Sequence, residues 1–204
     1  RLEEIFAHFP GIGPRQARRF VYYLQSRTTG AVKELADLIR EVRDMTTECS
    51  GCHRFFIDSG DKSLSCKICA DSSRDRSTLM VVARDSDFET IEKSGAYRGQ
   101  YFILGGTVPL LDKEPEKRIR LNALLKKIAK DKLEEVILSL NATPDGENTA
   151  DIVKSAIIDM TSDKTLYFGI VPLRLTLLGR GLSTGAELEY VDADTIKNAL
   201  LNRH

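Results

Sequence analysis

Four cysteines are the residues of this 204-residue sequence whose type and spacing point most directly to chemistry. Cys49 and Cys52 are separated by two residues, and Cys66 and Cys69 form a second pair with the same spacing. Two such pairs supply four thiolates that can surround a tetrahedral zinc ion at about 2.3 Å per Zn–S bond. The sequence therefore predicts one structural zinc ion per chain, bound by a small zinc finger over residues 49–72.

The alternative for these cysteines is free or disulfide-linked thiols, and disulfides are rare in a reducing compartment. The first twenty residues contain no apolar signal-peptide core, and no run of eighteen apolar residues occurs in the chain. We therefore expect a soluble cytoplasmic protein with reduced cysteines and no membrane segment. His53 directly follows Cys52, but a structural zinc site is closed at four ligands, so we expect His53 to remain outside it.

A short glycine motif, Pro10-Gly11-Ile12-Gly13-Pro14, is the second feature that suggests binding. Gly11 and Gly13 allow a turn with positive φ and leave backbone N–H groups uncovered, and Pro14 is favoured in the first turn of a helix. Such a turn suits a phosphate group. The alternative is a purely structural interhelical turn, and the motif alone does not separate the two.

The charge distribution around this motif favours the phosphate interpretation. The whole chain carries thirty basic and thirty acidic residues, so any polyanion site has to be local. No acidic residue lies between Glu4 and Glu34, whereas the same stretch contains five basic ones: Arg15, Arg18, Arg19, Arg27 and Lys33.

Apolar periodicity around the motif predicts helices over 2–9, from Pro14 to about Leu24, and from about Val32 to Met45. Beyond a polar linker at 71–77, short apolar runs alternate with helical patterns, which indicates an α/β domain with a largely parallel sheet. Strands are expected at 79–83, 101–104, 135–140, 165–171 and 175–178. Helices are expected around 88–93, 117–129, 149–160 and 192–201, and Asp85 is expected to be a helix N-cap.

Four motifs in the same order resemble the bacterial RecR family of recombination mediators, nearly from end to end. They are the stretch Phe9–Arg19 (FPGIGPRQARR), the cysteine quartet, the stretch Tyr97–Gly106 (YRGQYFILGG) and the stretch Gly185–Asp192 (GAELEYVD). The resemblance implies an α/β multi-module protein. Its parts would be a helix-hairpin-helix at 1–48, the zinc finger at 49–72, a Toprim domain at 73–172 and a C-terminal Walker-B-like, oligomerisation segment at 173–204.

The resemblance also implies a function in recombinational DNA repair. Members of this family form oligomeric rings on DNA, here expected as a dimer to tetramer, and act with RecO and RecF to load RecA. Carried over onto this sequence, the DNA-binding arginines correspond to Arg15 and Arg19, with Arg18 beside them and backbone contacts from Gly11 and Gly13. Such contacts would bind DNA without reading its sequence and would weaken with salt.

The residues at the Toprim acidic positions argue against an enzyme. Catalytic Toprim domains hold magnesium with a glutamate after the first strand and an Asp-x-Asp pair after a later one. Here the first position corresponds to Ala83 and the second begins with Asn141, so only Asp145 and Glu147 remain. Asp85 and Asp87 would substitute only in a shifted register.

Asp145 and Glu147 have two interpretations, either soluble loop residues or, by resemblance, contacts with RecO. The glycine-rich stretch 179–185 lacks the Gly-Lys-Ser/Thr ending of a phosphate loop, so we expect a turn there and no independent ATPase. Two alternative functions stay open at this point. One is a magnesium-dependent Toprim nuclease or primase-like enzyme, and the other is a zinc-ribbon interaction module without a DNA role.

Overall fold

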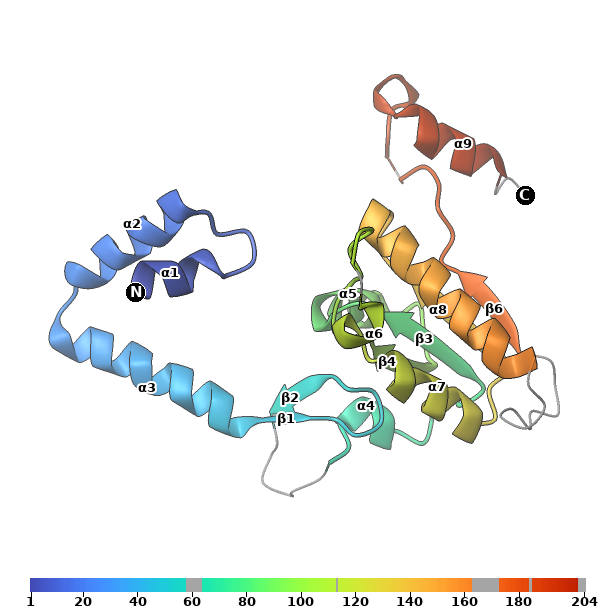
Figure 1. Ribbon diagram of the computed structural model, residues 1–204, viewed down its shortest axis with the longest axis horizontal. Coiled ribbons are helices and arrows are strands. Elements are labelled where there is room, and N and C mark those ends of the chain that lie inside the picture. The colour runs from blue at the N-terminus through green and yellow to red at the C-terminus, as the bar shows by residue number, and fades with distance from the viewer. Residues whose placement is uncertain (58–63, 113, 163–172, 184, 202–204) are drawn as a thin grey trace. The chain divides into compact units, whose positions relative to one another are not determined.

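The computed structural model describes residues 1–57, 64–112, 114–162, 173–183 and 185–201 (Figure 1). The chain divides into two compact units. One contains residues 1–47 and Ile57, and the other contains residues 48–56 and the described residues from Leu64 onward.

The smaller unit consists of three helices, α1 (Leu2–Ala7), α2 (Pro14–Gln25) and α3 (Thr29–Met45). Helices α1 and α2 pack through an edge-on contact between Phe6 and Phe20, whose ring centroids lie 5.6 Å apart, and Phe9 in the connecting turn packs edge-on against Phe6 at 5.5 Å. Ala17 is the fully buried residue of α2, as expected for the small side chain at the closest approach of two helices. Helix α3 begins where the Thr28 hydroxyl accepts a hydrogen bond from the Ala31 N–H at 3.3 Å.

The larger unit is built on a parallel sheet with the strand order β4-β3-β5-β6. The strands are β3 (Thr78–Val82), β4 (Gln100–Ile103), β5 (Glu135–Ser139) and β6 (Arg174–Leu177). Strand β3 pairs with both β4 and β5 in parallel, and β5 pairs with β6 in parallel. A two-stranded sheet of β1 (Thr46–Glu48) and β2 (Phe55–Ile57) belongs to the region of the cysteines.

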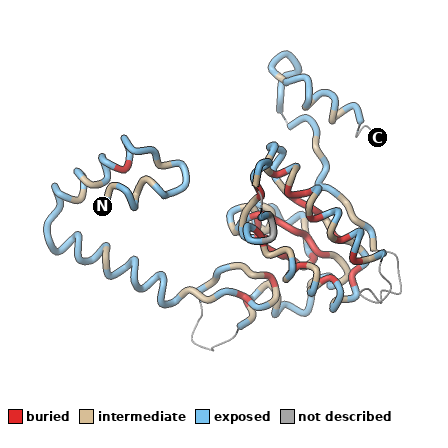
Figure 2. Tube along the Cα trace, viewed as in Figure 1, coloured by how far each residue is buried: buried red, intermediate tan, exposed pale blue. Residues whose placement is uncertain are grey.

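Helices cover both faces of the parallel sheet (Figure 1), so its strands are apolar on both sides. On β3, Leu79 and Val81 face a core shared with α7 (Leu121–Lys130) and α8 (Pro144–Ser162), whereas Met80 and Val82 face α5 (Asp85–Ser94). Figure 2 shows this burial concentrated on the central strands and on the inner sides of α7 and α8. The strand period of two therefore separates the two halves of the core.

Most predicted elements occur within two or three residues of their expected positions, and the deviations have local causes. The helix expected at 117–129 is divided into α6 (Pro115–Arg118) and α7, because the Arg120 N–H donates to the Leu104 carbonyl at 2.8 Å instead of continuing a helix. The helix expected at 149–160 begins at Pro144, where Thr143 accepts hydrogen bonds from the N–H groups of Gly146 and Glu147. The strand predicted at 165–171 lies outside the described residues.

The prediction that Asp85 is an N-cap is wrong, because Asp85 is the first residue of α5. The Asp87 carboxylate instead accepts a hydrogen bond from the N–H of the N-cap residue Arg84 at 3.0 Å, which stabilises the first turn of the helix. The remaining elements are α4 (Lys67–Ala70), the 3-10 helix η1 (Leu188–Tyr190) and α9 (Ala193–Leu201). Among the described residues, no helix is both long and apolar enough to cross a membrane.

Strand β6 is the last strand of the sheet within the described residues, and one carboxylate on β5 holds it through an ion pair and a hydrogen bond from a hydroxyl. The Thr176 hydroxyl donates to Glu135 at 2.7 Å and the Arg174 guanidinium lies 2.7 Å from its second oxygen. The hydrogen bond from Thr176, followed by Arg174, lowers the pKa of Glu135. This stabilisation is therefore fully present above the unfolded pKa of about 4.3 and is lost as the pH falls through the folded pKa.

We expect Glu135→Gln to reduce the free energy of unfolding at neutral pH and to lose this penalty on acidification. Urea unfolding between neutral pH and acid measures the difference from the wild type at each pH. The neighbouring exposed Glu134→Gln is the matched control and should show no such trend. A Glu135→Gln penalty that is independent of pH would contradict this account of β6.

Candidate metal centre and nucleic-acid interface

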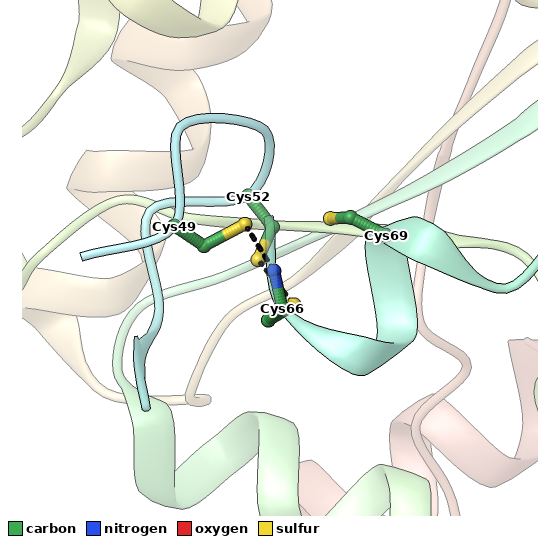
Figure 3. Close-up of side chains that lie close together, drawn as sticks. All are labelled: Cys49, Cys52, Cys66 and Cys69. Carbon is green, nitrogen blue, oxygen red and sulfur yellow. Dashed lines mark hydrogen bonds between the residues drawn. The ribbon is translucent and has the colours of Figure 1, made fainter. Parts of the chain in front are cut away.

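The four cysteines converge on one point, as predicted (Figure 3). Their sulfur atoms all lie within 4.8 Å of one another, and Cys52 Sγ lies 3.6 Å from Cys66 Sγ. A tetrahedral ion with four Zn–S bonds of about 2.3 Å needs sulfurs about 3.8 Å apart. No disulfide links them, and three of the four residues are buried. The donor set therefore fits one tetrahedral metal ion.

Tight turns place the sulfurs. The Cys49 N–H donates to the Arg54 carbonyl and the His53 N–H donates to the Cys49 carbonyl, both at 2.9 Å, so the chain doubles back after the first pair. Gly51 leaves room in this turn for the second pair, because a Cβ there would lie in tight contact with the Cys69 sulfur, at 3.2 Å. Cys66 precedes α4 and its N–H donates to Cys49 Sγ at 3.3 Å, which brings the second pair onto the first.

The thiols strongly influence one another's protonation. Interaction with Cys49 raises the pKa values of Cys52 and Cys69, whereas interaction with Cys52 lowers the pKa of Cys49. Interaction with Cys49 raises the pKa of Cys66, but the opposing effects of Cys52 and Cys69 lower it to about 6. The three buried thiols and the partly buried Cys69 thiol are thus not all ionised together, because four unscreened negative charges would repel. A divalent cation removes this constraint and deprotonates the ligands.

The finger is attached to the parallel sheet through its metal-binding turn. The Cys52 carbonyl accepts a hydrogen bond at 2.9 Å from the N–H of Ile103, on the outer edge of strand β4. On the other side, Asp85 accepts a hydrogen bond at 3.0 Å from the Phe55 N–H, and the Arg54 guanidinium lies 4.4 Å from the centre of the Phe88 ring. The cysteine turn therefore also covers an otherwise open sheet edge.

His53 stays outside the cysteine cluster and takes part in this attachment. Its Nδ1 lies 2.7 Å from Glu48, which also pairs with Arg120 at 3.3 Å, and its ring packs edge-on against Phe102 at 5.1 Å. The backbone φ of His53 is +63°. Sequence reasoning missed this linking role, although a histidine directly after a zinc-binding turn and an acid directly before it were visible signals.

The glycine motif forms the predicted turn between α1 and α2. Gly11 has a φ of +74°, and Gly13 is the N-cap of α2 with Pro14 at the first position. The N–H groups of Gly13, Arg15 and Gln16 have no hydrogen-bond partner within the described part of the chain. They lie at the positive end of a twelve-residue helix, which is the arrangement that binds phosphate oxygens.

The three predicted arginines are exposed on α2 but differ in their partners. Arg18 donates to Glu3 at 3.1 Å, and Arg19 donates to the Gln16 side chain at 3.1 Å. Arg15 pairs with no side chain among the described residues. Arg15 is therefore immediately available to an anion, Arg19 gives up only a neutral partner, and Arg18 has to exchange an existing ion pair.

The Toprim acidic positions do not form a cluster. Ala83 is buried at the end of β3, and Asn141 is exposed after β5. The Asp145 carboxylate accepts from the Leu110 N–H at 3.3 Å, and Glu147 pairs with Arg180 at 2.7 Å. Within the described ranges, the cysteines are the one group of three or more potential ligands close enough to share an ion.

The stretch 188–192 is not a strand, as a nucleotide-binding Walker B motif would be. Leu188–Tyr190 is a 3-10 helix, and Asp192 accepts hydrogen bonds from the N–H and hydroxyl of Thr195, which caps α9. The N–H of Thr195, followed by its hydroxyl, lowers the pKa of Asp192. This aspartate therefore has a structural role in the single chain.

The parallel sheet with helices on both faces and the cysteine finger at its edge define a Toprim-domain protein with a zinc-finger-type module. A family model described as Toprim domain matches residues 77–163, and one described as RecR, C-terminal matches residues 181–204. Proteins named Recombination protein RecR are 36% identical in Methylocella silvestris and 34% in Bifidobacterium longum subsp. infantis. Both alignments extend over 203 residues. They cover 100% of this chain and, respectively, 93% and 94% of the length of the relative. The chain belongs to the RecR family of recombination proteins.

We expect the purified protein to contain one zinc ion per chain and Cys66→Ser to lose it. Because the ligands come together only in the folded finger, metal binding adds to folding free energy, so chelation should lower the melting temperature. Elemental analysis and thermal unfolding measure both effects.

His53→Asn is the matched control, because asparagine tolerates positive φ and His53 is outside the sulfur cluster. It should retain the full zinc content. A Cys66→Ser protein that keeps one tightly bound zinc and an unchanged melting temperature would rule out the four-sulfur site.

Proposed function

We propose that this protein is a non-enzymatic mediator of recombinational DNA repair that binds DNA without sequence specificity. The observation that carries the proposal is the glycine turn of the smaller unit. Three unpartnered N–H groups, the start of α2 and the exposed Arg15 and Arg19 meet there in an electroneutral chain. Backbone N–H groups and arginines at such a site contact phosphates rather than base edges, so they position a nucleic acid without recognising its base sequence.

The same proposal includes assembly into a ring of two to four chains. Helix α3 supports it, because an apolar stripe on it is exposed in the single chain: Val32, Leu35, Leu38, Ile39 and Val42. Exposed apolar stripes of this kind are typical of surfaces that associate. The C-terminal segment 173–204 is proposed as a second contact between subunits, and the modules are proposed to span 1–48, 49–72 and 73–172.

Within this proposal the partners are RecO and RecF, the outcome is RecA loading on DNA, and the location is cytoplasmic. The cysteine site holds structural zinc. An enzymatic role is not favoured, since Ala83 and Asn141 cannot act as acidic ligands and the two remaining acids are bonded elsewhere, Asp145 to the Leu110 N–H and Glu147 to Arg180. A zinc-ribbon module without a DNA role would leave the exposed Arg15 and Arg19 beside the glycine turn unexplained, which disfavours it.

We expect Arg15→Glu combined with Arg19→Glu to abolish retention of DNA in a gel-shift assay at low salt. The change replaces two attractive charges with two repulsive ones beside the phosphate-binding turn. Arg40→Glu combined with Arg43→Glu on α3 is the matched control, with the same change in net charge, and should retain binding. Equal retention by both double variants would disprove the hairpin assignment.

We expect Glu147→Gln to weaken complex formation with RecO, as measured by calorimetry. Arg180→Gln separates a direct contact from a structural effect, because Glu147 pairs with Arg180. A direct contact predicts that Arg180→Gln preserves the affinity, whereas loss of the anchoring of the first turn of α8 predicts that it reproduces the Glu147→Gln defect. Unaltered affinity in Glu147→Gln would leave Glu147 as an exposed residue in the first turn of α8, without a part in RecO binding.

A further inference from the structure

A second basic surface lies in the larger unit, where the cysteine finger meets helix α7. A cavity of about 260 Å³ opens there. The finger contributes Ser50 and His53, strand β4 contributes Phe102, and three lysines of α7 complete the lining: Lys126, Lys127 and Lys130. The cavity is below the range of about 300–1,000 Å³ that holds drug-sized ligands, so it suits a small group.

The lysines of this cavity are not equivalent. Lys127 is half-buried and already satisfied, with its Nζ 2.7 Å from Asp131 and 2.9 Å from the Gln100 side-chain oxygen. Lys126 and Lys130 are exposed and have neither an ion pair nor a hydrogen bond within the described part of the chain. They are four residues apart on one helix, so their side chains emerge from the same face.

The charge balance of the cavity favours an anion. Asp131 is the acidic residue of its lining and is neutralised by Lys127. Helix α7 ends at Lys130, and the partial negative charge of its C-terminus, about half an elementary charge, opposes anion binding. Two unpaired ammonium groups outweigh that half charge, which leaves a net attraction.

We propose that Lys126 and Lys130 bind a phosphate group of a nucleic-acid strand at the mouth of this cavity, as a contact separate from the glycine turn. The inference rests on the proposed DNA binding and adds a second site to it. Lysine ammonium groups are point charges without the geometry for base recognition, so this contact is also independent of sequence. Two exposed ammonium groups hold one free phosphate weakly, whereas a strand already bound elsewhere on the protein reaches a high effective concentration.

The test is the salt dependence of single-strand binding by the full chain, measured by fluorescence anisotropy with a labelled oligonucleotide. We expect Lys126→Ala combined with Lys130→Ala to reduce the slope of log K against log salt by about 0.7, because the two lysines together neutralise one phosphate and each neutralised phosphate of a single strand contributes about 0.7. Lys126→Arg with Lys130→Arg keeps both charges and should keep the slope. A slope unchanged from wild type in the alanine variant would overturn the proposal.

The matched control is Lys93→Ala combined with Lys154→Ala, which removes the same charge from exposed positions on α5 and α8. An equal loss of slope in this control would overturn the local site in favour of a general effect of net charge. Failure of the wild type to bind any DNA would instead contradict the proposed function, so the two failures are distinguishable.

Calorimetry with inorganic phosphate separates a strand from a free anion. No measurable binding of phosphate, together with the reduced slope for DNA, supports a strand contact. Binding of phosphate that is lost in the alanine variant while the DNA slope stays unchanged would show a free-anion site and overturn the proposal.

Discussion

The cysteine finger depends on one constraint: its four sulfur atoms must lie close together around one common centre. Its buried residues are Cys49, Cys52 and Cys66 themselves, and the partly buried Phe56, Ile68 and Cys69 pack against them. So small a cluster cannot supply the apolar burial on which larger domains rely. We therefore expect metal–sulfur bonds to take the place of a hydrophobic core, and the turns around the cysteines bring the four potential ligands together.

The position of this finger has consequences for the rest of the larger unit. Strand β4 is an edge strand, and the Cys52 carbonyl pairs with its outer N–H group at Ile103. The Glu48 carboxylate, held by His53 and Arg120, adds a polar link between the finger and the segment before α7. The finger thus covers the edge of the sheet at β4 and forms one wall of the lysine-lined cavity. The cysteine site therefore shapes both of these neighbouring surfaces.

The stability of the parallel sheet does not depend on acidic residues at the ends of its strands. Its stability comes from two apolar layers, with Leu79 and Val81 on one side and Met80 and Val82 on the other. None of these contacts requires a carboxylate at the end of β3, where Ala83 is buried. The first turn of α8 instead packs directly on the loop after β5, because a Cβ on Gly146 in that turn would lie 2.0 Å from the Asn141 carbonyl oxygen.

Local patterns in the sequence were enough to predict the metal ligands, the glycine turn and the parallel α/β class, because spacing and periodicity act over a few residues. The cysteine pairs that begin at Cys49 and Cys66 and the continuous apolar run of β3 are such short-range signals. The family resemblance of the whole chain was likewise carried by motifs that remain intact in order.

Only the tertiary structure revealed the partners of the charged residues. Asp85 bonds to the Phe55 N–H rather than capping α5, and Lys127 is neutralised by Asp131 while Lys126 and Lys130 are left for an anion. Ion pairs and hydrogen bonds join residues distant in sequence, and one side chain has many competitors for each partner. Sequence alone determined which residues can ligate or carry charge, whereas three-dimensional packing decided which of those charges are already satisfied.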